Sequence, residues 1–321
     1  MIKIWKQRGS EISQSAILEK NSWIEVTNPD TLEIETLQRE YNIERDFIDD
    51  ILDLDERPRS ERENGYEMII FRVPIHDEKR EVPYTTIPLG VILAQDVVIT
   101  ICSIETEILV DIRKNRVRGI SFSNFNHFLL LLINRSIMYY LKYLKETNRQ
   151  SSAIEKDLQK SVRNNELIRL LTIEKSLVYF TTSLRANGLL IDKLQKRNVF
   201  RQTEDITDLL EDVITENQQA IEMANVYSNI LSGMMDAFAS VISNNLNVVM
   251  KRLTMISIIL MIPTLFASIY GMNIDLPWQN SPLAFTGIIG VSIVAAGLGI
   301  LLFTRSSMME RRKKRRLQKK K

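Results

Sequence analysis

Two long stretches without a charged residue lie near the C-terminal end of the chain, at residues 253–274 and 276–304. About 20 apolar residues are enough to cross the hydrocarbon core of a bilayer as a helix. We therefore expect a first membrane span at about residues 250–270 and a second at residues 283–304. Only a short outer loop, residues 274–282, is left between them.

A long helical pattern leads into the first of these spans. Between residues 203 and 270, only Gly233 and Pro263 interrupt a run of helix-forming residues. A single helix of this length would extend on the order of 100 Å. A proline is tolerated inside a span because neighbouring groups take up the freed carbonyl. We expect residues 203–273 to form one stalk helix that continues into the membrane.

The N-terminal third alternates between strand-like and helical patterns. Helical patterns occupy residues 31–41 and 44–54, and Arg57-Pro58-Arg59 interrupts the second. The pattern predicts an α/β domain over residues 1–105, followed by a helical region over residues 106–202. The strand-like runs are rich in β-branched or aromatic residues and occupy residues 2–5, 23–27, 67–73, 90–94 and 97–102.

One face of the long helix is polar where a coiled coil would be apolar. Ile, Leu and Phe flank this face on both sides. Polar groups inside membranes tend to face a bundle interior or a wet cavity. Alternatively, the hydroxyls bond back to their own helix, or the small side chains serve close packing. We call this set the polar stripe: Asn247, Met250, Thr254, Ser257, Met261, Thr264, Ser268 and Gly271.

The same spacing continues upstream of the apolar run, through Asp236 and as far as Asp212. A solvated helix face would show this pattern too, but continuity across the membrane boundary favours one hydrated axis. Because two spans cannot enclose a pore, we expect several copies to surround the axis, with the first span inside. The second span carries small residues suited to helix packing, among them Gly287, Gly290 and Gly297.

Charge is distributed unevenly along the chain. The formal net charge is only +2, although ten Lys and Arg residues fall within the last 17 positions, 305–321. Basic residues beside a span favour the cytoplasmic side, so we predict a basic cytoplasmic tail there. Two spans return the N-terminus to the same side, and the start of the chain has no signal-peptide pattern. The prediction is a plasma-membrane protein with both termini in the cytoplasm. A patch for anionic lipid or nucleic acid is the alternative interpretation of the tail.

Enzyme chemistry is not indicated. His76 and His127 are the only histidines, and Cys102 is the only cysteine. A single cysteine excludes an intrachain disulfide and fits a reducing compartment. The chain has no metal triad, nucleophile elbow or glycine-rich phosphate loop. We therefore expect no catalytic residues, no organic cofactor and no nucleic-acid partner.

The end of the first apolar run carries the most specific motif. Residues 261–273, which end in Tyr270-Gly271-Met272-Asn273, closely resemble the end of the first span in the CorA family of divalent-cation channels. The resemblance implies an α+β fold with a cytoplasmic αβα domain, a long stalk helix and two transmembrane helices. It also implies assembly into a funnel-shaped homopentamer in the lipid bilayer. Other segments that resemble the family are Trp23-Ile24, Asp49-Asp50-Ile51-Leu52 with Arg57-Pro58, and residues 212–250.

The resemblance implies a selectivity filter formed by Gly271, Met272 and Asn273, with a ring of Asn273 amides at the outer mouth. Mg²⁺ sheds its water reluctantly, so a neutral ring can bind the hydration shell without holding the ion for long. A helix C-cap is the alternative role of Asn273. Met250 and Leu253 fall at the family's hydrophobic constriction. The implied pore-lining residues are Asn247, Met250, Leu253, Ser257, Met261, Thr264 and Ser268.

A regulatory site for intracellular Mg²⁺ is implied as well. Its two carboxylates fall on Asp50 and Asp212, which would meet between subunits and share an ion that holds the channel closed. Asp49 and Asp236 are further candidates. Mg²⁺ is thus expected both as the transported ion and as the regulator.

Two other functions remain open at this point. A transporter of Co²⁺, Ni²⁺ or Zn²⁺ would share the architecture, but the intact Gly-Met-Asn motif favours Mg²⁺. Softer ions also prefer imidazole or thiolate ligands, which the polar stripe does not contain. A membrane-anchored scaffold would be expected to show an apolar stripe instead.

Overall fold

The computed structural model describes residues 1–9, 11–63, 66–94, 96–160, 164–197, 199–200, 203–272, 283 and 285–301. The chain divides into two compact units, Met1–Phe238 and Ala239–Lys321. The first unit contains all the strands and five complete helices of the described chain. The two units are described separately below.

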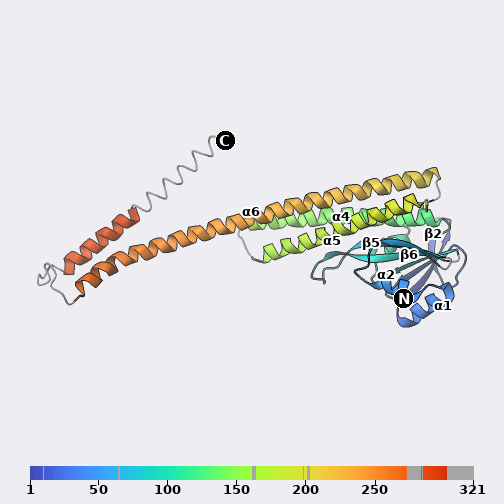
Figure 1. Ribbon diagram of the computed structural model, residues 1–321, viewed down its shortest axis with the longest axis horizontal. Coiled ribbons are helices and arrows are strands. Elements are labelled where there is room, and N and C mark those ends of the chain that lie inside the picture. The colour runs from blue at the N-terminus through green and yellow to red at the C-terminus, as the bar shows by residue number, and fades with distance from the viewer. Residues whose placement is uncertain are drawn as a thin grey trace. The chain divides into compact units, whose positions relative to one another are not determined.

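A seven-stranded mixed sheet forms the centre of the first unit (Figure 1), with the order β2-β1-β3-β7-β6-β5-β4. Only the β3–β7 pair is parallel, with Ile24 opposite Ile99, and the other pairs are antiparallel. The strands are β1 (Ile2–Arg8), β2 (Glu11–Ser15), β3 (Trp23–Thr27), β4 (Arg59–Glu63), β5 (Tyr66–His76), β6 (Tyr84–Ala94) and β7 (Val97–Cys102).

Helices cover both faces of this sheet. Met68 and Ile70 of β5 pack with the helices α1 (Thr31–Tyr41) and α2 (Arg45–Leu52) in one core. Ile69 and Phe71 of the same strand pack into the other core, with α3, α4 and α5. The αβα fold implied by the family resemblance is confirmed: the sheet lies between two layers of helices. Its central strands read as continuous apolar runs because both faces are buried. The helices of the second face are α3 (Glu107–Arg113), α4 (Phe125–Lys160) and α5 (Asn164–Lys196).

Local sequence signals set the ends of α1. The Asp30 side chain accepts a hydrogen bond from the Glu33 backbone N–H at 2.9 Å, and the Glu33 carboxylate accepts one from the Asp30 N–H at 3.1 Å. This reciprocal capping box satisfies donors at the start of the helix. Asn42 adopts the left-handed conformation at the C-cap, with φ of 55°. Asn tolerates that conformation well, so α1 and α2 are separated by a short, defined turn.

The two edge strands were absent from the sequence-based prediction. β2 and β4 lie at opposite ends of the sheet order, and their sequences, EISQS and RSERE, are almost entirely polar. Hydrophobic alternation does not reveal such strands. Charged side chains on edge strands protect the exposed backbone groups from pairing with other chains, which is why these segments are polar.

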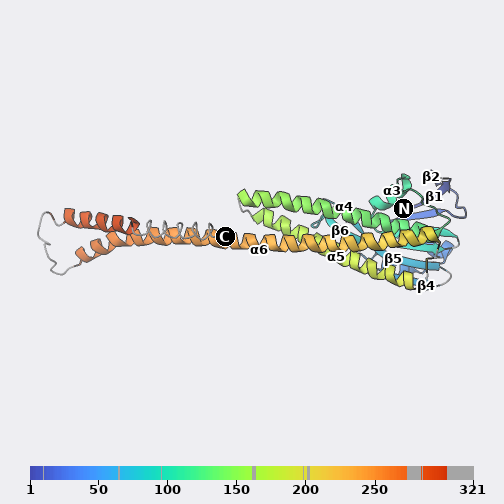
Figure 2. The same cartoon turned by 90° about the horizontal axis from the view of Figure 1, so that it is seen from above.

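The helix α6 (Glu204–Tyr270) runs for 67 residues and includes Pro263 without ending there. Within the first unit, up to Phe238, it lies beside α4 and α5 (Figure 2). The Asn134 side chain of α4 donates to the Glu216 carboxylate of α6 at 3.0 Å. The spacing of the buried residues is close to that of a coiled-coil seam. These residues are Ile206, Leu210, Val213, Ala220, Ala224, Leu231 and Phe238.

The second unit contains the rest of α6 and the helix Phe285–Leu301. Among the described residues, α6 alone is long and apolar enough to cross a membrane, and Phe285–Leu301 is apolar but shorter. The two helices pack closely, because a Cβ built on Gly299 would lie 3.6 Å from Ile262 Cδ1. Half-buried side chains on α6 mark the contact face: Met255, Ile259, Ile262 and Phe266.

Candidate ion pathway and cation-binding residues

The polar stripe is exposed along the whole of the second unit. At 3.6 residues per turn, it lies roughly half a turn away from Ile259 and Ile262, on the side opposite the helix Phe285–Leu301. The helix Phe285–Leu301 therefore does not cover the polar stripe. The exposed members are Asn247, Met250, Thr254, Ser257, Met261, Thr264, Ser268 and Gly271.

The hydroxyls of the stripe bond back to their own helix, which is one of the two alternatives left open by the sequence. Thr254 Oγ1 donates to Met250 O at 2.9 Å, Ser257 Oγ to Leu253 O at 3.1 Å, and Thr264 Oγ1 to Leu260 O at 2.8 Å. A hydroxyl has one proton and two acceptor lone pairs. Because each proton is committed to a carbonyl, these oxygens can still accept hydrogen bonds from water. A hydrated cation presents the O–H donors of its water shell, so back-bonding is compatible with a role in a wet pathway.

The motif at the end of α6 is described as far as Met272. The Gly271 N–H donates to Ala267 O at 3.0 Å and to Ser268 O at 3.2 Å, and the Met272 N–H donates to Ile269 O at 3.3 Å. These bonds tighten the last turn of the helix. Asn273, the outer loop 274–282 and the basic tail 305–321 lie outside the described residues. The filter role of Asn273 and the predicted bounds of the second span stay predictions.

Met250 and Leu253, the residues of the predicted constriction, are 51% and 56% exposed. These two side chains lie at the N-terminal end of the apolar stretch of α6, and no other element of the described chain buries them. A ring of such side chains from several chains could close a narrow passage by excluding water.

The position of Asp50 is set by its neighbours on α2. Ile48 and Ile51 are fully buried against the sheet. Gly90 of β6 makes this close approach possible, because a Cβ there would lie 2.4 Å from Ile51 Cδ1. With Ile51 facing the sheet, the carboxylate of Asp50 lies on the outer side of α2 with 41% of its side chain exposed.

Arg59 at the start of β4 pairs with this carboxylate. Its Nη2 lies 2.6 Å from Asp50 Oδ2, its Nε lies 2.8 Å from Glu61, and its Nη1 pairs with Glu56. Burial lowers the pKa of Arg59, but the Asp50 hydrogen bond and the surrounding carboxylates outweigh it, so the pKa is raised and the charge is permanent. Asp49 pairs separately with Arg45 at 3.3 Å.

Asp212 and Asp236 lie on exposed positions of α6. Burial raises the pKa of Glu216, and the nearby charge of Asp212 raises it further. Among the described residues, no group of three or more His, Cys, Asp or Glu side chains is arranged to hold a metal ion. The donor chemistry nevertheless fits Mg²⁺, which prefers carboxylate oxygens and retains several waters. Within one chain, α2 packs in the core on one face of the sheet and Val213 of α6 belongs to the core on the other face, so an ion shared by Asp50 and Asp212 would have to lie between chains.

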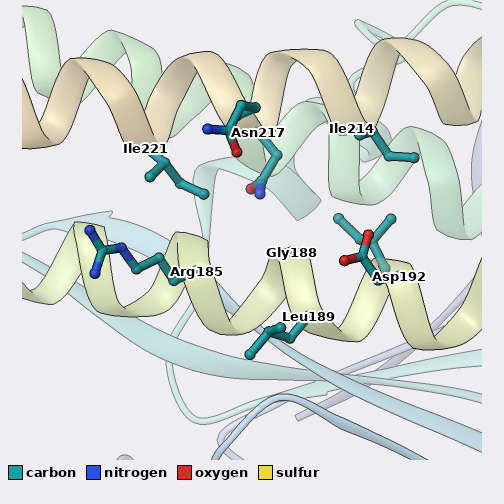
Figure 3. Close-up of a pocket in the computed structure, with 9 residues that line it drawn as sticks. Arg185, Gly188, Leu189, Asp192, Ile214, Asn217 and Ile221 are labelled. Carbon is teal, nitrogen blue, oxygen red and sulfur yellow. The ribbon is translucent and has the colours of Figure 1, made fainter.

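A cavity of 370 Å³ between α5 and α6 was not anticipated from the sequence (Figure 3). Asn217 reaches from α6 towards Gly188 of α5, where an added Cβ would lie 2.9 Å from Asn217 Nδ2. Asn217 is 4% exposed and donates to Leu184 O at 3.2 Å. The sequence signal that could have revealed this close contact between α5 and α6 is Gly188, a glycine inside a helical pattern. This cavity lies on the packed side of α6 and not on the polar stripe.

Comparison with known proteins finds relatives along almost the whole chain. The model of the family described as CorA-like Mg²⁺ transporter protein matches residues 19–312. The cobalt/magnesium transport protein CorA of Methanocaldococcus jannaschii is 28% identical over 294 residues, which cover 88% of this chain and 90% of that protein. The magnesium transport protein CorA of Helicobacter pylori is 25% identical over 299 residues, with coverage of 89% and 90%.

Solved structures show the same fold. The complete structure of the CorA magnesium transporter from Methanocaldococcus jannaschii matches with a TM-score of 0.81 at 24% identity, covering 95% of this chain and 98% of that chain. The full-length CmaX protein matches with a TM-score of 0.69 at 15% identity, covering 95% of this chain and 96% of that chain.

Proposed function

Because the chain belongs to the CorA-like Mg²⁺ transporter family, which is a family of transporters and not of enzymes, we propose that it forms a channel for Mg²⁺ uptake. The observation that carries this proposal is the exposed polar stripe of α6, opposite the face that packs on the helix Phe285–Leu301. Relatives that cover most of the chain are named as magnesium or cobalt/magnesium transport proteins.

The channel requires several chains. Two helices cannot surround a hydrated ion, so the polar stripes of several copies have to meet around one axis. We infer a homopentamer with α6 inside and the second span, residues 283–304, outside. Both termini then lie in the cytoplasm, with the basic tail 305–321 beside the inner face of the plasma membrane.

Selection takes place at the outer mouth. Gly271, Met272 and Asn273 form the filter, in which a ring of Asn273 carbonyl oxygens accepts hydrogen bonds from the water shell of the ion. Mg²⁺ retains that shell because its dehydration is costly. Neutral amides bind the shell without the strong attraction that would slow the exit of the ion.

Conduction and gating follow from the rest of the stripe. Ser257, Thr264 and Ser268 offer hydroxyl oxygens to the hydration shell, and Asn247 offers an amide. Met250 and Leu253 form the constriction that closes by excluding water. Asp50 of one subunit and Asp212 of the next would hold intracellular Mg²⁺ as the regulatory ion, with Asp49 and Asp236 as further acidic groups. Loss of these ions leaves repelling carboxylates, which favours separation of the subunits.

Mg²⁺ influx into vesicles that contain the purified protein tests the filter. Asn273→Ala is expected to reduce influx by at least about tenfold, which corresponds to roughly 1.4 kcal/mol of lost ion stabilisation, while the oligomer is retained in size-exclusion chromatography. Asn280→Ala, which removes the same amide from the outer loop, is the matched control and should conduct normally. Normal flux through the Asn273 variant would contradict the filter role.

Transport of Co²⁺, Ni²⁺ or Zn²⁺ is the second candidate function, because two relatives are named for cobalt as well as magnesium. The polar stripe contains no imidazole or thiolate, the ligands that favour the softer ions. Competition between these ions and Mg²⁺ in the same vesicles decides between the two functions.

A further inference from the structure

The guanidinium of Arg59 is surrounded by carboxylates. Asp50 lies 2.6 Å from Nη2 and Glu61 lies 2.8 Å from Nε, while Glu56 pairs with Nη1. The side chain of Arg59 is 26% exposed, and that of Asp50 is 41% exposed. The guanidinium fork matches carboxylate oxygens geometrically, so one oxygen of Asp50 is already bound within its own subunit.

We propose that Arg59 is a built-in competitor of the regulatory cation at Asp50, and that it sets the Mg²⁺ concentration at which the channel closes. This inference rests on the proposed function, in which Asp50 is a ligand of the sensor. The Arg59 guanidinium occupies Asp50 Oδ2 in the absence of the ion. Binding of Mg²⁺ therefore requires that Asp50 exchange its partner.

The remaining contacts of Arg59 make this exchange feasible. When Asp50 turns to the ion, Arg59 still has Glu56 and Glu61 as partners, so its charge is not left unpaired. If the role of Arg59 were only structural, the fold would depend on its contact with Asp50. A competitor of the ion can release that contact while the fold is kept. Arg59 is thus a positioning residue that acts on the ion only through Asp50.

A second arginine near the same helix face provides a comparison. Arg45 pairs with Asp49 at 3.3 Å, and both side chains are 53% exposed. This pair joins residues one helical turn apart, is more exposed than the Arg59–Asp50 pair and does not include Asp50. Exposed pairs of this kind are worth little, so Arg45 should have only a weak influence on the sensor.

The test measures how Mg²⁺ protects the full-length protein against limited proteolysis. The midpoint is the Mg²⁺ concentration that gives half-maximal protection. Chymotrypsin is the protease, because it does not cleave at arginine. Arg59→Gln is expected to lower this midpoint about threefold to fivefold, the size expected for one partly exposed ion pair. Arg45→Gln removes the same charge from α2 and should shift the midpoint by less than about twofold. Arg59→Lys keeps the charge without the fork and should fall between the wild type and Arg59→Gln. If Arg59→Gln does not fold, the shift of Arg59→Lys decides the question.

Asp50→Asn separates this inference from the proposed function. If Asp50 is a ligand, Asp50→Asn raises the midpoint, and adding Arg59→Gln to that variant has no further effect. An unchanged midpoint in Asp50→Asn would remove Asp50 from the sensor. A raised midpoint in Asp50→Asn, together with an unchanged or raised midpoint in Arg59→Gln, would overturn the role of Arg59 alone.

Discussion

Asp111 illustrates how a single buried charge is held in the first unit. It is 2% exposed, lies on α3 and accepts hydrogen bonds from Tyr139 at 2.6 Å and from Arg135 Nε at 3.0 Å, both on α4. Burial alone would raise the pKa of Asp111, but these bonds from Tyr139 and Arg135, with a further one from Arg116, hold it below the ordinary value. The ionised carboxylate thus ties α3 to α4.

Asp111→Asn is expected to destabilise the protein by about 2–3 kcal/mol, because Arg135 and Tyr139 lose a charged acceptor. Since the folded pKa of Asp111 is lowered, its stabilisation is complete above its unfolded value of about 3.9 and is lost as the pH falls through the folded value. Thermal unfolding of the detergent-solubilised protein should show the difference from wild type at pH 7 and a smaller difference near pH 3. A difference that is equal at both pH values would contradict the charged role of Asp111.

At the level of elements, the contact between α5 and α6 depends on a matched pair of residues. Asn217 of α6 is buried next to Gly188 of α5, and its amide is fixed by the bond to Leu184 O. A glycine inside a helix costs about 1 kcal/mol relative to alanine. The close approach of the two helices compensates for this cost, because only glycine leaves room for the Asn217 amide.

Gly188→Ala is therefore expected to lower the unfolding temperature of the solubilised protein by several degrees, since the new methyl group would meet Asn217 Nδ2 at 2.9 Å. In the Asn217→Ala background the obstacle is gone. There, Gly188→Ala should be neutral or stabilising by up to about 1 kcal/mol through helix propensity. A destabilisation of equal size in both backgrounds would show that the Asn217 contact is not the cause.

At the level of the whole molecule, the exposed polar stripe supports the proposal that several chains are needed to build the channel. The stripe and the packed face lie on opposite sides of α6, so the helix Phe285–Leu301 does not cover the polar residues. In a bilayer, polar groups on such a face are expected to meet other polar groups or water. The proposed contact between copies of α6 would supply both.

Single cysteines test whether the stripes of neighbouring chains meet. Ser257→Cys on the stripe should form disulfide-linked dimers on oxidation in membranes, whereas Ile256→Cys on the neighbouring apolar face should not. The native Cys102 can stay, because it is fully buried and burial raises its pKa to about 12, which makes it unreactive. Equal cross-linking at both positions, or none at either, would contradict a central position of the stripe.

The sequence by itself determined the long helix with its polar face, the buried strands and the family of this protein. The apolar stretch and the spacing of Thr254, Ser257 and Thr264 predicted a long helix with a polar face, and the Gly271-Met272-Asn273 motif pointed to the family that the comparisons then showed. Strands such as β7 were predictable because burial on both sides requires continuous apolar residues. The polar edge strands β2 and β4 carry no such signal.

Tertiary structure alone decided which groups far apart in sequence meet. The pairing of Asp50 with Arg59, the fit of Asn217 beside Gly188 and the side of α6 that packs on Gly299 all depend on how complete elements come together. Periodicity records whether a residue is buried, but it does not record which neighbour buries it. Contacts of this kind depend on shape and on the position of charges in three dimensions, and the order of residues along the chain does not state them.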